Sequence, residues 1–520
     1  MPVQRNQGAR LSAATAPLAA AIALALFSAA PAAGGSGSAA PNPATPAAST
    51  DQAKPDGKGK PSKEKRRQQQ RANRRQKRPN VIVVMTDDQD DSMIGLDNTV
   101  RLIGSRGTTF TNSYVSFPLC CPSRATLLTG QYAHNHGVTS TELPNGYNGL
   151  NHANTLAVWL RAGGYRTGMV GKYLNGYGIN DGIPERTSDA KAIPPGWSEW
   201  YALTDDKDQR RYRYRLNENR QIVKYKSRKK DYVTDVLANK AVNFVKRRAP
   251  QPKPFFLWFN PTAPHGEAGR PFGAQRNPTP APRHLGAFEG AVRPRTPNFN
   301  EADVSDKPDF IQATPQLSAA EVLDVDLRYR GRLESMLSVD EAVKRLIGRL
   351  RKAGDLGKTY VIFTSDNGLL MGAHRLVLKN YLYEEDTQVP LLIRGPRFPA
   401  GAVREQPVSN VDLAPTIAEL TRVRPGLTMD GRSLLPAARD PSFGRGREIL
   451  FERSGFDAGI RSGDWVYIDR GPGADPELYN LAEDPFQLES LHDVPAHNAI
   501  EAQLAARLAQ LRNCVGAACP

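Results

Sequence analysis

The chain has 520 residues, of which 39% are hydrophobic and 23% are charged, and its formal net charge at pH 7 is +16. This composition is typical of a globular enzyme and excludes a membrane protein with many spans; four cysteines also exclude a scaffold held by many disulfides. The basic excess is concentrated in residues 51–80, which hold twelve Lys or Arg and three Asp or Glu, so the rest of the chain is much closer to balance.

The first 33 residues have the layout of a secretory signal peptide. A short basic segment precedes an apolar run over residues 11–27, and an Ala-Pro-Ala sequence at 30–32 follows as a cleavage site. A transmembrane anchor is the alternative, but the run is short for a bilayer and Pro17 interrupts it. We therefore expect a secreted or cell-envelope protein that has no transmembrane span after the signal peptide is removed.

Residues 34–78 predict a disordered basic linker. They are rich in Gly, Ala, Pro, Lys and Arg and nearly lack large apolar side chains, so they bury too little surface to offset the entropy of the chain. The stretch from Lys63 to Arg78 is a candidate segment for contact with an acidic polysaccharide or cell-wall polymer. We expect no specific nucleic-acid partner, because a secreted chain rarely meets one.

Short apolar runs after residue 79 predict buried β-strands at 81–85, 255–259, 360–363 and 389–393. Helical spacing lies between these runs over Asp231–Arg248, and a Ser-x-x-Glu pattern at 338–341 indicates a helix that begins there and ends near Ala353. This alternation predicts an α/β fold with a largely parallel sheet covered by helices. We expect a catalytic part over residues 79–400 and a smaller part over 401–520.

Two polar clusters follow predicted strands. Asp87 and Asp88 come directly after the run 81–85, and Asp366 and Asn367 come after the run 360–363. Their oxygens suit Ca²⁺ or Mg²⁺ better than Zn²⁺, although Asp and Asn are also common in turns and helix caps. Because ligand sites of such sheets lie at the carboxyl ends of the strands, two clusters in this position favour a metal site.

The most informative segment is CCPSRATLLTG at residues 120–130. Taken by itself, it offers the Cys120 thiol near the Arg124 guanidinium, which is an arrangement suited to a nucleophile. A pair of small buried side chains and a pair of metal-binding thiols are the alternatives, and the residues alone leave all three open.

The pattern Cys-x-Pro-Ser-Arg followed by Leu-Leu-Thr-Gly resembles the signature of the type I sulfatases, and it assigns the key position to Cys120. The segment GYRTGMVGKYL at 164–174 resembles the second signature of the same family. Further matches, in consistent order over about residues 79–495, are TDDQ at 86–89, APH at 263–265, SDNG at 365–368, His374, Lys379 with YEE at 383–385, ELYNL at 477–481 and DP at 484–485.

The resemblance implies an alkaline-phosphatase-like fold, which has a large mixed, mostly parallel sheet and a smaller C-terminal α+β subdomain with an antiparallel sheet. It implies hydrolysis of sulfate monoesters by a formylglycine hydrate, which a dedicated maturation enzyme forms from Cys120. One divalent cation, Ca²⁺ in preference to Mg²⁺, would be bound by Asp87, Asp88, residue 120, Asp366 and Asn367. Arg124, Lys172, His265 and Lys379 would act in catalysis, and Lys172, His265, His374 and Lys379 would contact the substrate.

Within this family the motifs resemble most the N-acetylglucosamine-6-sulfatase branch, which implies a sulfated sugar as the substrate. One position departs from the family pattern, because Leu174 stands where many sulfatases have His.

Cys514 and Cys519 would form a small disulfide loop and leave Cys121 as a free thiol. The alternative functions are a phosphate or phosphonate ester hydrolase of the same superfamily and a secreted protein that binds polyanions through its basic linker.

Overall fold

The computed structural model describes residues 78–179, 188–204, 210–267, 277–453, 455 and 457–520. The predicted signal peptide and nearly all of the predicted linker lie outside these residues. Within the described ranges, no helix is both long and apolar enough to cross a membrane.

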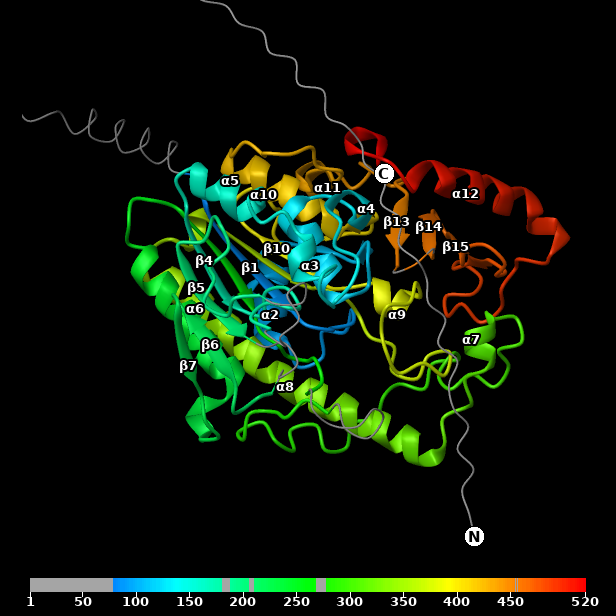
Figure 1. The fold of residues 1–520 in the computed structure, drawn as a ribbon, viewed down its shortest axis with the longest axis horizontal. Coiled ribbons are helices and arrows are strands. Elements are labelled where there is room, and N and C mark those ends of the chain that lie inside the picture. Colours follow the sequence, from blue (N-terminus) through cyan, green and yellow to red (C-terminus); the bar gives the residue numbers. More distant parts are fainter. Residues whose placement is uncertain (1–77, 180–187, 205–209, 268–276, 454, 456) are drawn as a thin grey trace, which may run out of the picture. The chain divides into compact units, whose positions relative to one another are not determined.

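The largest sheet formed by the described residues has ten strands in the order β11-β2-β10-β9-β1-β8-β4-β5-β6-β7 (Figure 1). Its strands are β1 (Asn80–Thr86), β2 (Thr108–Phe110), β4 (Arg166–Gly171), β5 (Glu199–Thr204), β6 (Arg215–Glu218), β7 (Gln221–Lys224), β8 (Phe255–Asn260), β9 (Thr359–Ser365), β10 (Leu391–Arg394) and β11 (Ala402–Arg404). The central strands β9, β1, β8, β4 and β5 run parallel, and antiparallel pairs lie toward both edges. The predicted mixed, mostly parallel sheet is confirmed, and the four predicted strands are β1, β8, β9 and β10.

Both faces of this sheet are covered, which explains why β1, β8 and β9 are apolar along their length and buried at every position. One face packs against α3 (Cys120–Thr129), α5 (Leu156–Ala162) and α10 (Leu413–Thr421). The other packs against α2 (Asp97–Leu102), α6 (Val233–Arg248) and α8 (Ala319–Lys352). Alternate side chains of β1 serve the two faces: Val83 lies in the cluster with Leu128, and Val84 lies in the cluster with Leu237.

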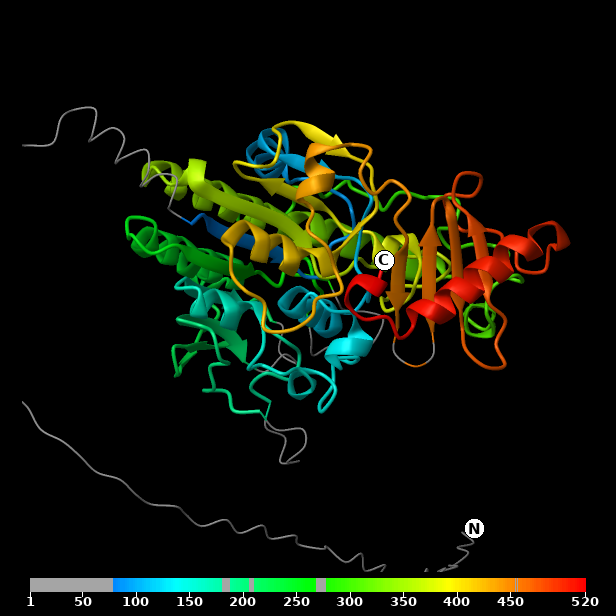
Figure 2. The ribbon, with the colours of Figure 1, turned by 90° about the horizontal axis from the view of Figure 1, so that it is seen from above.

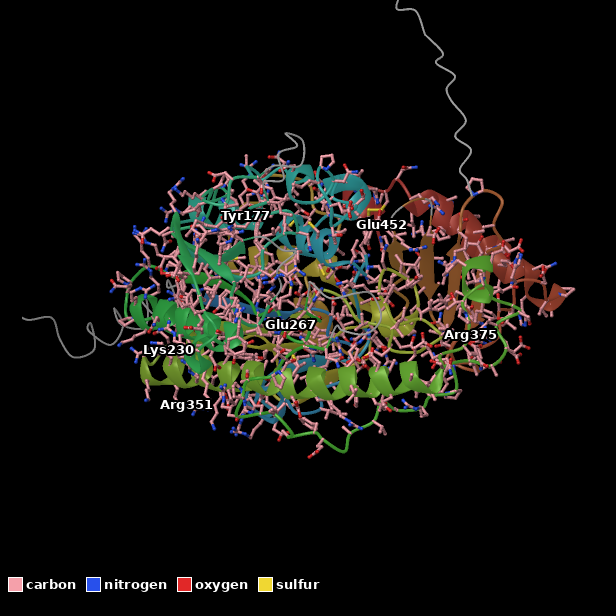
Figure 3. All side chains as sticks on the ribbon, turned by 60° about the horizontal axis from the view of Figure 1, so that its bottom comes forward. Tyr177, Lys230, Glu267, Arg351, Arg375 and Glu452 are labelled. Carbon is pink, nitrogen blue, oxygen red and sulfur yellow. A yellow bond between two sulfur atoms is a disulfide. The ribbon has the colours of Figure 1, made fainter. Side chains whose placement is uncertain are left out.

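Helix α8 corrects one prediction from the sequence. It begins at Ala319, where the Ser318 hydroxyl accepts a hydrogen bond from the Glu321 backbone N–H and the Glu321 carboxylate accepts one from Ser318. The prediction of a start at Ser338 is wrong, because the Ser-x-x-Glu pattern recurs there inside a helix that has already begun. The helix continues to Lys352, and Figure 3 shows Arg351 near this end.

A second, antiparallel sheet contains β13 (Ile449–Glu452), β14 (Ala458–Ser462), β15 (Trp465–Asp469) and β16 (Glu477–Asn480). Helix α12 (Asn498–Leu511) lies across it (Figure 2) and buries Leu504, Leu508 and Leu511 against it. This is the antiparallel sheet expected in the C-terminal part, and the large sheet continues through β11, past residue 400. Cys514 and Cys519 form the predicted disulfide, and Cys121 is buried and forms no disulfide with another described residue.

Short elements connect these layers. They are β3 (Ser113–Tyr114) paired with β12 (Val408–Ser409), and the helices α4 (Ala133–His136), α7 (Asp309–Gln312), α9 (Glu384–Thr387) and α11 (Leu435–Arg439).

Candidate active site

The two polar clusters of the sequence meet because β1 and β9 are parallel neighbours, with Thr86 beside Ser365 at their carboxyl ends. Asp87 and Asp88 leave β1, and Asp366 leaves β9. The Asp88 backbone N–H donates to Asp366 Oδ1 at 3.0 Å, across the two strand ends. Asp88 has a φ of 66°, a left-handed conformation that is uncommon outside Gly and Asn. A strained turn therefore directs adjacent carboxylates into one buried space.

Cys120 is the first residue of α3 and is 1% exposed. Its Sγ atom lies 3.4 Å from Asp87 Oδ1 and 3.7 Å from Asp88 Oδ1. Lys379 Nζ lies 2.7 Å from the same sulfur and also contacts the Asp88 carboxylate. Residue 120 thus lies beside two carboxylates and an ammonium group.

Arg124 lies one helical turn after Cys120 and holds the strand ends together. Its Nε donates to Asp366 Oδ2 at 2.7 Å, and its Nη1 donates to the Lys172 backbone carbonyl at 2.9 Å. Lys172 follows β4, and its Nζ donates to both carboxylate oxygens of Asp87 at 2.9 and 3.0 Å. The motif around Cys120 therefore links the ends of three strands.

His265 follows β8 and reaches the same cluster. Its Nε2 lies 3.5 Å from Asp88 Oδ2, and its Nδ1 lies 2.6 Å from the Gly266 carbonyl oxygen. Since a carbonyl only accepts, Nδ1 carries a proton and Nε2 faces the cluster. Burial lowers the pKa of His265 to about 4, although the charges of Asp88 and Asp87 oppose this shift.

Opposite charges control the protonation of the cluster. Burial raises the pKa of Asp87, but Lys172 and other cations outweigh it and hold that pKa well below its ordinary value. For Asp88, burial is likewise outweighed, chiefly by Lys379, and the pKa falls to about 2. Burial raises the pKa of the Cys120 thiol well above its ordinary value, even though Lys172 and Lys379 oppose this shift. Asp87 and Asp88 are therefore ionised, and residue 120, as a thiol, is neutral. Burial raises the pKa of Asp366, although the Arg124 guanidinium opposes this shift.

The cluster offers ligand atoms suited to a hard cation. Ligand atoms of Asp87, Asp88, Cys120 and His265 all lie within 4.8 Å of one another. Asn367 is fully buried, and its Nδ2 donates to Asp88 Oδ1 at 2.8 Å, while its Oδ1 has no hydrogen-bond partner among the described residues. A buried amide oxygen without a donor is unusual, and coordination of a cation would satisfy it.

The remaining predicted contact, His374, lies in another network. Its Nδ1 is 2.7 Å from Glu301 Oε2, its Nε2 is 3.5 Å from Asn298 Nδ2, and its ring packs on Tyr383 with the ring centroids 4.4 Å apart. The structure brings nine of the ten predicted site residues into one cluster and places His374 outside it. Leu174, at the position that departs from the family pattern, is buried in the core beside this cluster.

Reasoning from the sequence missed two arginines of α8. Arg328 and Arg332, four residues apart, line a pocket together with Asp88, His265 and Lys379. Both arginines are 5% exposed. Their spacing within a helix that precedes a metal-site strand was the available signal, but surface arginines of ordinary helices show the same spacing.

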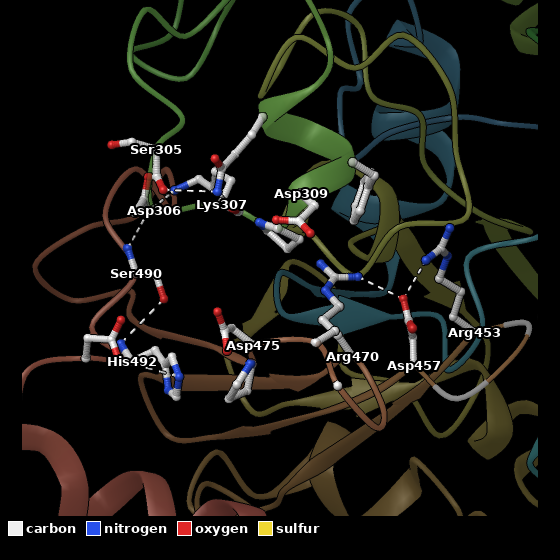
Figure 4. Close-up of a pocket in the computed structure, with 17 residues that line it drawn as sticks. Ser305, Asp306, Lys307, Asp309, Arg453, Asp457, Arg470, Asp475, Ser490 and His492 are labelled. Carbon is white, nitrogen blue, oxygen red and sulfur yellow. Dashed lines mark hydrogen bonds and ion pairs between the residues drawn. The ribbon is translucent and has the colours of Figure 1, made fainter.

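A larger cavity of about 510 Å³ lies between the α7 segment and loops of the small sheet (Figure 4). Several of its charges already form ion pairs: Lys307 with Asp306, and Arg453 and Arg470 with Asp457. In the part of the chain that the structure describes, no predicted site residue lines it. This cavity is separate from the catalytic cluster.

Comparisons with known proteins match the chain to two families. Residues 79–423 match the Sulfatase family, and residues 372–514 match the family described as N-sulphoglucosamine sulphohydrolase, C-terminal. The chain is 38% identical over 376 residues to the N-acetylglucosamine-6-sulfatase of Homo sapiens, which covers 70% of this chain and 65% of that protein. The chain spans between about half and two thirds of the length of the curated relatives that it matches first.

Two solved structures share the fold. One is a complex of a protein with its substrate, D-glucosamine-2-N,6-O-disulfate; its TM-score is 0.69 at 24% identity, over 83% of this chain and 97% of that chain. The other is the phosphonate monoester hydrolase of Agrobacterium radiobacter, with a TM-score of 0.63 at 22% identity, over 84% of this chain and 95% of that chain. Together with the family match over residues 79–423, the ordered motifs show that this chain belongs to the sulfatase family and is similar to its N-acetylglucosamine-6-sulfatase branch.

Proposed function

We propose that this protein hydrolyses sulfate monoesters of a sulfated sugar, with 6-sulfated N-acetylglucosamine as the substrate class. The observation that carries the proposal is that Cys120 lies within reach of the carboxylates of Asp87 and Asp88 and of the ammonium of Lys379. The family match and the N-acetylglucosamine-6-sulfatase relatives support the reaction and the sugar.

In this proposal a maturation enzyme converts Cys120 to formylglycine, so the Sγ position stands for an oxygen of the hydrated aldehyde. One hydroxyl of the hydrate attacks sulfur and the sugar alcohol leaves. The second hydroxyl then loses its proton, the carbonyl re-forms and sulfate is expelled. A serine would complete only the first half and remain sulfated, which is the chemical reason for an aldehyde hydrate.

We further propose that Asp87, Asp88, Asp366 and Asn367, with residue 120, hold one divalent cation, for which Ca²⁺ is favoured. The hard oxygen ligands and the unpartnered Oδ1 of Asn367 fit such an ion. When bound, the cation would polarise sulfate oxygens and stabilise developing negative charge.

The protein's own side chains supply the remaining steps. Lys172 Nζ contacts Asp87 and Lys379 Nζ contacts residue 120, and both ammonium groups would bind the sulfate oxygens. Arg124 fixes Asp366 and the Lys172 backbone, so it positions the cluster. Lys379, or His265 through Nε2 after that atom takes up a proton, would protonate the leaving oxygen.

We also propose that the protein is exported and acts outside the cell or in its envelope. The apolar segment over residues 11–27 supports this proposal, and relatives named as extracellular sulfatases agree with it. Detection of the mature protein outside the cytoplasm, with its N-terminus near residue 33, would test it.

The reaction is tested with enzyme whose maturation is verified. Peptide mass spectrometry is expected to show an aldehyde or its hydrate at position 120, and turnover is measured on a panel of sulfated monosaccharides. Cys120→Ser should abolish sulfatase activity with the fold retained, whereas Cys121→Ser, a change at the adjacent buried thiol, should retain most of it. Full activity of Cys120→Ser would refute the mechanism.

The same assay separates this function from that of a phosphate or phosphonate ester hydrolase, because a phosphonate monoester hydrolase shares the fold. Aryl esters of sulfate, phosphate and phosphonate are compared at equal concentration. We expect the sulfate ester to have the highest kcat/KM, and a clear preference for a phosphorus ester would overturn the proposal.

A further inference from the structure

Arg332 is buried, and no described carboxylate of the catalytic cluster forms an ion pair with it. One end of its guanidinium, Nη2, donates to the backbone carbonyl of Asp88, and the other end, Nη1, has no hydrogen-bond partner among the described residues. In that part of the chain, no carboxylate lies within ion-pair distance of it. A buried charge without a partner costs several kcal/mol, so an anionic ligand would be expected to complete this site.

The nearby carboxylates do not supply an ion pair for Arg332. The Asp88 carboxylate is paired with Lys379, and the carboxylate of Asp90 lies 3.6 Å from Arg293. Burial lowers the pKa of Arg332 below its ordinary value, and Asp90 and Asp88 only partly offset this effect. Among the described residues, no carboxylate therefore neutralises the charge of Arg332 at close range.

Arg328 adds a second guanidinium on the same face of α8, one helical turn away. It donates to Asp324 at 3.1 Å and to the Val377 carbonyl at 3.2 Å. Like charges four residues apart are unfavourable in a helix. Arg328 is paired with Asp324, so it adds positive charge beside Arg332 without requiring an anion of its own.

Both arginines line the pocket that also contains Lys379 and His265. The rest of its wall is largely apolar, with Pro264, Leu369, Val377 and Leu378. The volume of this pocket is about 40 Å³, which accommodates one anionic group but not a sugar ring. A substrate whose scissile sulfate lies at Cys120 would therefore keep its ring outside the pocket and direct an anionic substituent past Lys379 toward the arginines.

We propose that Arg332, assisted by Arg328, binds a second anionic group of the substrate, a sulfate or a carboxylate, and so determines which sulfated sugars the site accepts. This inference rests on the proposed function and adds a specificity site to it. The planar guanidinium binds either group through two parallel hydrogen bonds.

The test compares three probes. N-acetylglucosamine 6-sulfate has one anion, glucosamine N,6-disulfate adds a second sulfate, and a disaccharide of a uronic acid with 6-sulfated N-acetylglucosamine adds a carboxylate. We expect the wild type to have a lower KM for at least one doubly charged probe. Arg332→Gln should reduce that preference at least tenfold, chiefly by raising KM, and Arg332→Lys should restore part of it. The probe that loses its advantage identifies the sulfate or the carboxylate as the recognised group.

Arg328→Gln provides a second variant if Arg332→Gln does not fold, and it should reduce the same preference by a smaller factor. The control is Arg345→Gln, which changes an exposed arginine of the same helix and should leave all three probes unaffected. An equal loss of kcat/KM on every probe would mean that Arg332 only holds the Asp88 backbone, and an unchanged preference would mean that it binds no substrate anion. Either result overturns the proposal.

Calorimetric binding of the three probes to Cys120→Ala, with and without Arg332→Gln, gives a readout that needs no turnover. Tighter binding of a doubly charged probe that Arg332→Gln removes would support the anion site even if the proposed hydrolysis failed. Equal affinities for the two proteins would overturn the anion site even if hydrolysis were confirmed.

Discussion

The catalytic cluster and the cluster around Glu477 are both buried charge networks, but they differ in whether each buried polar group has a partner within the protein. In the small sheet, Glu477 Oε1 accepts a hydrogen bond from Arg470 Nε at 2.6 Å. Its Oε2 accepts hydrogen bonds from the hydroxyls of Tyr383 and Tyr479, each at 2.6 Å. Arg470 also donates to Asp457 at 3.0 Å. Every charge of this network has a partner inside the protein, which is the arrangement expected of a structural ion pair.

The catalytic cluster is organised around ligands that the protein does not supply. Asn367 Oδ1 and Arg332 Nη1 are buried without partners among the described residues, and Asp88 has a left-handed backbone. Unsatisfied groups and strain of this kind persist where a bound ligand compensates for them. Completeness of the hydrogen bonds, rather than burial alone, therefore separates a structural charge cluster from a catalytic one.

The largest effect is expected for Asp88→Asn, since Asn tolerates the left-handed conformation but lacks the charge. Activity should fall by at least about 10³-fold, because cation binding and the charge balance around residue 120 are lost. The free energy of unfolding should change by less than about 2 kcal/mol. Steady-state kinetics and urea unfolding measure the two effects; a severe loss of stability with normal activity per folded molecule would contradict the comparison.

For Arg470→Met, in the network around Glu477, we expect a large loss of stability with little loss of activity. Removing this cation leaves Glu477 buried and unpaired, so the free energy of unfolding should fall by about 3–5 kcal/mol. The kcat of the molecules that remain folded should stay within about twofold. Urea unfolding monitored by circular dichroism checks the first part, and a variant as stable as the wild type would show that this network is not a structural one.

Ca²⁺ should stabilise the protein through the catalytic cluster. At a free concentration one hundred times its Kd, a ligand specific to the folded state adds about 2.7 kcal/mol, and a chelator should reverse the effect. Asn367→Ala should remove most of this shift in Tm. The matched control is Asn175→Ala, because Asn175 is also buried with an unpartnered Oδ1 but lies outside the predicted ligand set. Equal shifts in both variants would place the cation elsewhere.

The smallest expected effect is a change of stability with pH caused by His136, a buried residue of α4 that contacts α3. Its Nδ1 accepts the Val138 N–H at 3.1 Å, its Nε2 contacts the Thr126 hydroxyl at 3.1 Å, and burial lowers its pKa to about 3. The unfolded chain binds a proton below its ordinary pKa of about 6.5 and the folded chain does not, so stability falls as the pH decreases. Between about pH 7.5 and 5.5 the loss should be about 1 kcal/mol.

This prediction is tested by comparing the slope of the unfolding free energy against pH for the wild type and His136→Gln. The difference isolates one group from other buried histidines, and identical slopes would show that folding does not lower the pKa of His136.

The local sequence was sufficient to predict those features whose residues lie together in one short segment. The ends of β1 and β9 were predicted from apolar runs followed by carboxylates, and the motif around Cys120 identified the candidate nucleophile. The order of these motifs also predicted the family, which the comparisons confirm. These predictions succeed because buried parallel strands are apolar throughout, and because their carboxyl ends meet at one edge of the sheet.

Other features depend on packing between distant segments. His374 follows a matched motif, yet its ring lies on Tyr383 and bonds to Glu301, and a linear pattern does not show which neighbours a loop brings. Arg332 belongs to a helix whose start was predicted about twenty residues too late, and only burial beside Asp88 distinguishes it from a surface arginine. The sequence by itself determined the family motifs, the candidate site residues and the strand ends, because each depends on neighbouring residues. Tertiary structure alone decided which buried charges are complete and which are left for a ligand, because that depends on contacts between residues far apart in the chain.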